Sequence, residues 1–216
     1  MASTFPGAID SFTDPLSGSA LNSPSHSAQH ADLNDAAEKI ETYMGLVKVI
    51  PTGATNGTVS STGTVTVGNA VGSVTVSGAF SSLYNNYKIL YTGGVANTSL
   101  YLNMTLGSAS TAYYGSLYGA AYATGTPIGI GINNGAGWLY AGLATTSYTM
   151  FDCDIFMPNM ARNTNISSKW SFNLSSTGYS TFTGEHAALT QHTAFTITAT
   201  GGNMTGGSLT VYGYRI

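Results

Sequence analysis

A heptad pattern of apolar and ring-bearing residues runs through one N-terminal segment, residues 25–44. Its positions are spaced alternately four and three residues apart, which is typical of a narrow seam between the helices of a coiled coil. Ser23 or Ser25 can cap the start of this helix, and Gly45 can end it. We therefore expect residues 25–46 to form an oligomerisation helix. The expected seam residues are His26, His30, Leu33, Ala37, Ile40, Met44 and Val47.

Residues 1–24 precede this helix and carry an apolar residue every three to five positions. Pro6, Pro15 and Pro24 prevent a continuous helix over the same stretch. We expect an extended arm that becomes ordered against another protein, a floppy tail being the alternative. The expected anchoring residues are Phe5, Ile9, Phe12, Leu16 and Leu21.

After Val47 the pattern changes to short β-branched runs of alternating polarity, separated by Gly and Asn. Residues 47–79 predict either a β-rich connector or the first strands of the next domain, and residues 80–216 predict an antiparallel β-sandwich head domain. Residues 107–137 are interpreted as a loop region rich in Gly, Ala and Tyr. The expected strands are 46–51, 64–67, 73–76, 87–92, 99–106, 148–157, 169–175, 194–200 and 208–214.

Charge is scarce in this chain of 216 residues, of which 7% are charged and 43% are apolar. Eight charged residues lie in residues 1–48 and seven in residues 49–216, and residues 89–151 contain none. We expect a folded β protein with a surface of hydroxyl and amide groups. The net charge of −3 and the lack of Lys and Arg clusters argue against nucleic-acid binding. No apolar run is long enough for membrane insertion, and the N-terminus lacks the pattern of a secretory signal peptide.

The sequence offers little catalytic chemistry, and we expect neither an enzyme nor a cofactor. Cys153 lies in an apolar strand pattern and is interpreted as a buried core thiol. Asp152 and Asp154 flank it and therefore face solvent, where a weak cation site is a minor alternative. His186 and His192 have no catalytic partner in any familiar spacing.

His26 and His30 are the other histidines of the chain, and both lie on the expected seam. In a trimer they would form stacked rings of imidazoles, a candidate metal or anion site. The simpler alternative is that both residues contact the arm or a partner protein.

The aromatic residues of the central region suggest a binding surface. Tyr and Trp rings can stack on sugar faces, and the same composition suits adaptable protein recognition. The alternative is that these rings fill the core or a subunit interface. The candidate recognition residues are Tyr113, Tyr114, Tyr118, Tyr122 and Trp138.

Two motifs make the chain resemble a known family. The stretch Phe-Ser-Ser-Leu-Tyr-Asn-Asn-Tyr-Lys-Ile at 80–89, and Gly-Asn-Met-Thr-Gly at 202–206 followed by Val-Tyr-Gly-Tyr-Arg at 211–215, are similar to the opening and closing patterns of a β-sandwich domain. That domain occurs in minor tail proteins and tail fibres of tailed bacteriophages. The stretches 5–12, 23–30 and 34–36 are similar to the arm and helix that open many such proteins.

The resemblance implies a jelly-roll-like sandwich preceded by an arm and a short trimeric coiled coil. It implies a structural virion protein, a homotrimer held to other tail or capsid proteins by its N-terminal region. The sandwich would then face the host, where it could attach to a surface glycan or protein. A capsid decoration or head fibre protein is the alternative function.

Overall fold

The structure is a computed structural model that describes residues 26–43, 45–173 and 177–214. The predicted arm and Met44 lie outside the described residues. Internal contacts divide the chain into two compact units, Met1–Val47 with Arg215–Ile216 and Lys48–Tyr214. Each unit is described by itself below.

The first unit contains the helix α1, His26–Tyr43, which lies within the helix predicted from the heptad pattern. The side chains of Leu33, Ala37 and Ile40, three of the expected seam positions, are exposed on this helix. The helix is therefore present, whereas its assembly into a coiled coil remains a prediction. Val47 lies in the short strand Leu46–Lys48, so its prediction as a seam residue of the helix is wrong.

The second unit is built from antiparallel strands. β1 lies at the border of the two units and is named together with these strands. The strands are β1 Leu46–Lys48, β2 Gly53–Thr55, β3 Gly57–Val59, β4 Thr64–Val67, β5 Ser73–Ser77, β6 Asn86–Thr92, β7 Val95–Ala96, β8 Leu100–Leu106, β9 Tyr113–Ala121, β10 Pro127–Gly135, β11 Trp138–Ala144, β12 Thr149–Phe156, β13 Thr164–Asn173, β14 Thr177–His186, β15 Phe195–Ala199, β16 Met204–Thr205 and β17 Ser208–Tyr214.

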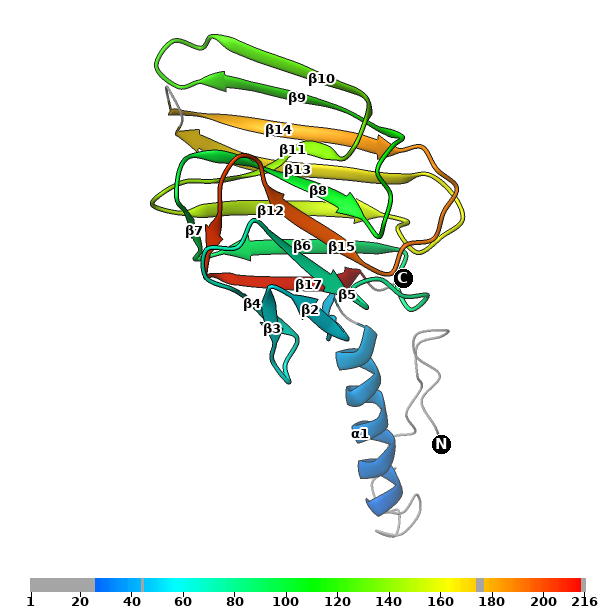
Figure 1. Cartoon of the computed structure of the whole chain (residues 1–216). Coiled ribbons are helices and arrows are strands. Elements are labelled where there is room, and N and C mark those ends of the chain that lie inside the picture. The colour runs from blue at the N-terminus through cyan, green and yellow to red at the C-terminus, as the bar shows by residue number, and fades with distance from the viewer. Residues whose placement is uncertain (1–25, 44, 174–176, 215–216) are drawn as a thin grey trace. The chain divides into compact units, whose positions relative to one another are not determined.

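Strand pairing forms two large layers, which Figure 1 shows one in front of the other. One layer runs in the order β10-β9-β14-β13-β12-β6-β17-β4-β3, and the other runs β11-β8-β15-β5-β2. The layers are joined where β11 pairs with the start of β12, through Leu143 opposite Met150. The unit is thus mainly β with large antiparallel sheets, an arrangement consistent with a β-sandwich.

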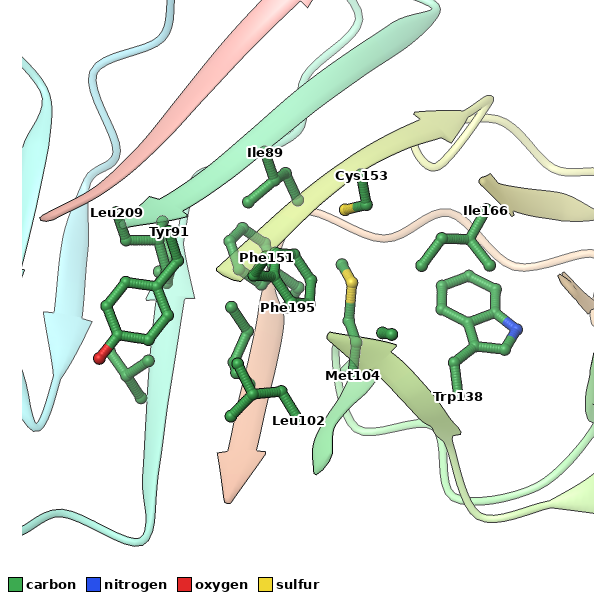
Figure 2. Close-up of a cluster of buried hydrophobic side chains, with 14 of the residues drawn as sticks. Ile89, Tyr91, Leu102, Met104, Trp138, Phe151, Cys153, Ile166, Phe195 and Leu209 are labelled. Atoms are coloured by element: carbon green, nitrogen blue, oxygen red, sulfur yellow. The ribbon is translucent and has the colours of Figure 1, made fainter. Parts of the chain in front are cut away.

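The core lies between the two layers and contains alternate residues of each strand (Figure 2). Ile89 and Phe151 enter it from one layer, and Leu102, Met104 and Phe195 enter it from the other. All five side chains are at most 1% exposed. Burial of one such side chain contributes about 1.5–3 kcal/mol, so this alternation accounts for most of the driving force that holds the layers together.

The two motifs that carry the phage resemblance lie next to each other in this core. β6 and β17 pair along their whole length, from Asn86 opposite Tyr214 to Thr92 opposite Ser208. The Tyr84 ring covers Gly213, where an added Cβ would lie only 2.3 Å from the ring carbon Cγ. A glycine is therefore required at this position of the closing motif because the ring occupies the space of a side chain.

Tyr87 binds the backbone of the opening motif at Ser81. Its hydroxyl oxygen accepts a hydrogen bond from the Ser81 backbone N–H and donates one to the Ser81 carbonyl, each at 2.7 Å. The Tyr87 ring meets the Phe80 ring edge-on, with 4.9 Å between the ring centroids. The segment before β6 is thereby fixed to the core.

The strand predictions were accurate for some strands and wrong for others. β4 and β17 have the expected limits, and β13 begins five residues before the expected start. The interpretation of residues 107–137 as loop is wrong, because this region contains β9 and β10, which form a hairpin. β11 and β14 were also missed.

Candidate functional site

The exposed tyrosines gather on the outer face of β9, β14 and β10, which we call the tyrosine face. Tyr118 alternates with inward-facing residues of β9, and Tyr122 lies in the turn that follows the last residue of this strand, Ala121; the two side chains are 56% and 63% exposed. Tyr179 of β14 is 47% exposed and lies opposite Ala120, so its side chain shares their face. Tyr114 is also exposed on the same side of β9.

The aromatic rings of this face are arranged to present flat surfaces. The Tyr122 and Tyr179 rings are near-parallel, with centroids 6.4 Å apart and an angle of 25° between their planes. Tyr118 lies in β9 opposite Thr181 of β14 and Gly129 of β10. A chain-like ligand that follows β9 could therefore contact several rings in succession.

Small and hydroxyl-bearing residues surround the rings. Ser116 of β9 and Thr183 of β14 lie opposite each other and are exposed. On β10, Gly131 lies opposite Ser116 and Gly129 lies opposite Tyr118. A Cβ added to either glycine would have no neighbour within 4 Å. The face is thus open above β10. Its residues on β9 and β10 are uncharged, and Glu185 of β14 lies opposite Tyr114.

Tyr113 and Trp138 do not belong to this surface, and their prediction as recognition residues is wrong. Both side chains are fully buried, and their rings meet edge-on with centroids 5.2 Å apart. The Leu106 backbone N–H donates to the Tyr113 hydroxyl oxygen over 2.7 Å. Burial raises the pKa of Tyr113 to about 12. Tyr113 is buried because the odd-numbered residues of β9 face the core.

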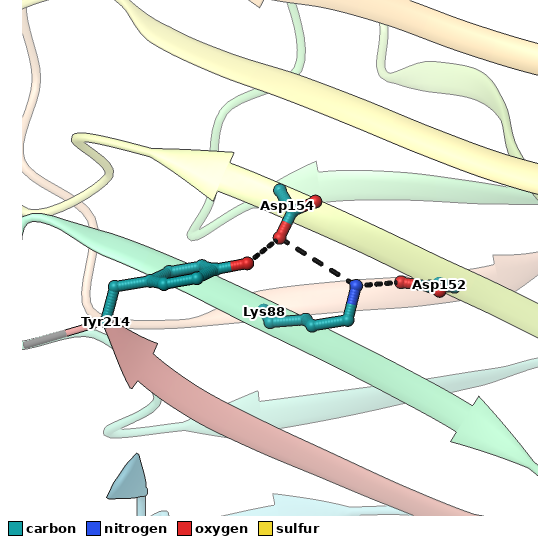
Figure 3. Close-up of polar contacts among 4 residues, drawn as sticks. All are labelled: Lys88, Asp152, Asp154 and Tyr214. Atoms are coloured by element: carbon teal, nitrogen blue, oxygen red, sulfur yellow. Dashed lines mark hydrogen bonds and ion pairs between the residues drawn. The ribbon is translucent and has the colours of Figure 1, made fainter. Parts of the chain in front are cut away.

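Asp152 and Asp154 lie on the outer face of β12, as expected, and both carboxylates contact polar groups of neighbouring strands (Figure 3). The Lys88 ammonium group from the neighbouring strand β6 forms an ion pair with Asp152, and lies 3.9 Å from the Asp154 Oδ1. The Tyr214 hydroxyl donates to Asp154. Partial burial and this carboxylate together raise the pKa of Tyr214 to about 12. The place between the carboxylates is thus occupied by a lysine.

Cys153 is fully buried between these two aspartates, which confirms its interpretation as a core thiol. Burial, reinforced by the two carboxylates, raises the pKa of its thiol well above the ordinary value. The thiol therefore stays protonated at neutral pH and is a poor nucleophile.

His186 and His192, which had no evident partner in the sequence, lie together in the structure. The Nε2 atom of His192 is 3.3 Å from the Nδ1 atom of His186, and the side chains are 5% and 1% exposed. They line a pocket of about 370 Å³ together with the segments around Ser108 and Gln191. Burial lowers the pKa of both imidazoles, that of His192 to about 4.

Sequence reasoning also missed Tyr179. β14 is rich in Thr, Ser and Gly, so its pattern predicts no strand, and only pairing with β9 places Tyr179 beside Tyr122. The stretch Gly178–Tyr179–Ser180 does alternate in polarity, which is a weak sequence signal for a strand that contains Tyr179.

The remaining predicted residues belong to the first unit. His30 is exposed on α1, and the side chains of His26 and the arm residues lie outside the described part. Within residues 26–43, 45–173 and 177–214, no group of three or more His, Cys, Asp or Glu residues could hold a metal ion. In the same part of the chain, no helix is long and apolar enough to cross a membrane.

Comparisons of this chain with protein-family models, curated proteins and solved structures gave no match.

Proposed function

We propose that this chain is a structural virion protein of a tailed bacteriophage, a trimeric tail fibre or minor tail protein that attaches to host-surface glycan. In this proposal the arm and helix anchor the trimer through a short coiled coil. The β unit is its jelly-roll-like sandwich head. The phage motifs at both ends of that unit, together with the tyrosine face, support the proposal.

The tyrosine face is the observation that carries the attachment function. Exposed tyrosines bind ligands at low entropic cost, because the ring is rigid and has only two rotatable side-chain torsions. The C–H face of a pyranose packs on such a ring, while the surrounding hydroxyls exchange hydrogen bonds with sugar hydroxyls. β9 and β10 carry no charged residue, and the charged residue of β14, Glu185, is acidic, so a neutral polysaccharide fits this face better than an acidic one.

The exposed seam of α1 supports the trimer. Leu33 and Ile40 are 58% and 43% exposed, one heptad apart, and would be covered in a coiled coil. A trimer would present three copies of the tyrosine face. Linked copies bind a repetitive polysaccharide far more tightly than one copy does, because each binding event after the first is intramolecular.

The chemistry of the β unit supports a binding role over catalysis. The Lys88 ammonium pairs with the carboxylate of Asp152 and lies 3.9 Å from that of Asp154, and the Cys153 thiol is buried. A glycosidase needs one protonated carboxyl group and one free carboxylate facing its substrate.

Immunogold labelling of phage particles with antibodies against the chain tests the proposed location. We expect gold at the tail or its fibres. Gold over the capsid would support the alternative, a decoration or head fibre protein, and would contradict the tail assignment.

A further inference from the structure

We propose that His186 and His192 form a binding site for a late first-row divalent cation such as Zn²⁺, in the pocket at the end of β14. This site is separate from the tyrosine face and does not depend on the virion role. It uses two of the four histidines of the chain.

The separation of the two ring nitrogens matches such an ion. The Nε2 atom of His192 and the Nδ1 atom of His186 lie 3.3 Å apart. Two nitrogens bound to one tetrahedral Zn²⁺ at about 2.0–2.1 Å are themselves about 3.3 Å apart. An ion could therefore replace the hydrogen bond between the rings with little movement of the backbone.

The surroundings of His186 orient it as a ligand. A hydrogen bond with the Thr111 backbone raises the pKa of His186 against the effect of burial, as expected when the ring donates to the carbonyl. With one N–H committed to Thr111, the other ring nitrogen carries a lone pair, which we assign to Nδ1, the atom that faces His192. Metal-binding histidines commonly donate their second nitrogen to a carbonyl in this way.

The tautomer of His192 changes when the ion replaces the hydrogen bond. In the ion-free pair, the His192 Nε2–H donates to the lone pair of His186. When the ion binds, the His192 hydrogen moves from Nε2 to Nδ1 through solvent, so both facing nitrogens become lone-pair donors and no proton is released.

The pocket can supply the rest of the coordination shell. Its lining includes the hydroxyl-bearing residues Ser108, Thr111 and Thr190. A volume of about 370 Å³ admits the ion with several waters, each of which occupies about 30 Å³. Two imidazoles with oxygen or water ligands suit Zn²⁺, Cu²⁺ and Ni²⁺ better than Mg²⁺ or Ca²⁺.

Calorimetric titration of the full chain with Zn²⁺ tests the site, in a His26→Gln/His30→Gln background that removes the other two histidines. We expect saturable binding of one ion per chain. Adding His192→Gln or His186→Asn, which keep a polar atom near the lost nitrogen, should weaken binding at least about tenfold. Absence of binding in the background variant, or unchanged affinity after either further substitution, would overturn the proposal.

A measurement without a ligand substitution guards against misfolded variants. In ¹⁵N spectra of the same background variant, Zn²⁺ should shift the Nδ1 resonance of one imidazole and the Nε2 resonance of the other. Ring resonances that stay unchanged at saturating Zn²⁺ would also overturn the site.

Discussion

Gly213 is the residue at which the closing motif packs against the opening motif. Tyr84, four residues into the opening motif, lies directly on it, and no side chain larger than hydrogen fits beneath the ring. The burial of Tyr87 and Ile89 in the same region depends on this close approach of β6 and β17.

Gly213→Ala should therefore lower the free energy of unfolding by about 1–3 kcal/mol, because the added methyl group must displace the ring of Tyr84. Gly131→Ala is the matched control, since its added methyl group meets no neighbour within 4 Å. Urea unfolding followed by circular dichroism measures both. Equal stability of the two variants would show that Tyr84 does not pack as described.

The histidine pair makes the stability of the β unit depend on pH. The folded chain holds the pKa of His192 at about 4, below its ordinary value of 6.5. Between these pH values the unfolded chain binds a proton that the folded chain does not, so the free energy of unfolding falls as the pH drops from 6.5 to 4. The full stabilisation is present above pH 6.5.

Urea unfolding of the wild type in EDTA should show a loss of up to about 3 kcal/mol from this group across that interval. His192→Gln removes the titrating group and should flatten the curve in the same interval. If the variant and the wild type lose stability in parallel, His192 is not held neutral in the folded chain.

Sequence patterns predicted single residues well where a buried face alternates with an exposed one. The buried Cys153 and the exposed Asp152 follow directly from the period of β12. Tyr113 was misplaced because its region was read without a period, and the pairing of His186 with His192 depends on the return of the chain after β14. Such contacts arise from tertiary packing, which no local pattern records.

At the scale of elements, the strands with the most apolar sequences were the ones that the sequence predicted. β6, β8, β12 and β17 carry large apolar residues on their inner face and were expected. β9, β10 and β14 carry fewer large apolar residues, such as Leu117 and Phe182, among many Gly, Ser and Thr residues, and they are also stabilised by pairing with each other, which a single-strand pattern cannot indicate.

The helix α1 carries the prediction on assembly. Its exposed Leu33 and Ile40 would be buried in a trimer, so Leu33→Glu with Ile40→Glu should convert trimer to monomer because it places charges in the seam. Asn34→Glu, exposed and outside the seam, is the control and should stay trimeric. Sedimentation equilibrium measures the mass, and circular dichroism checks that the β unit remains folded. A monomeric wild-type chain would contradict the trimer.

At the scale of the whole molecule, charge and aromatic residues are distributed to different parts of the chain. Eight of the charged residues lie in the first 48 positions, whereas β9 and β10 have none and provide most of the tyrosine face. This division fits a protein whose N-terminal region serves assembly and whose β unit binds an uncharged ligand. The composition indicated such a ligand, but only the sheet order brought Tyr179 beside Tyr122.

Binding of the purified full chain to an array of neutral and acidic bacterial surface polysaccharides tests this account most directly. We expect binding to at least one neutral polysaccharide, with a loss of at least about tenfold in Tyr118→Ala/Tyr122→Ala, since each stacked ring contributes about 1 kcal/mol or more. Leu83→Ala, which removes an exposed side chain 76% accessible and outside the tyrosine face, should bind like the wild type. Binding that survives loss of both tyrosines, or that is confined to acidic polysaccharides, would contradict the tyrosine face as the attachment site.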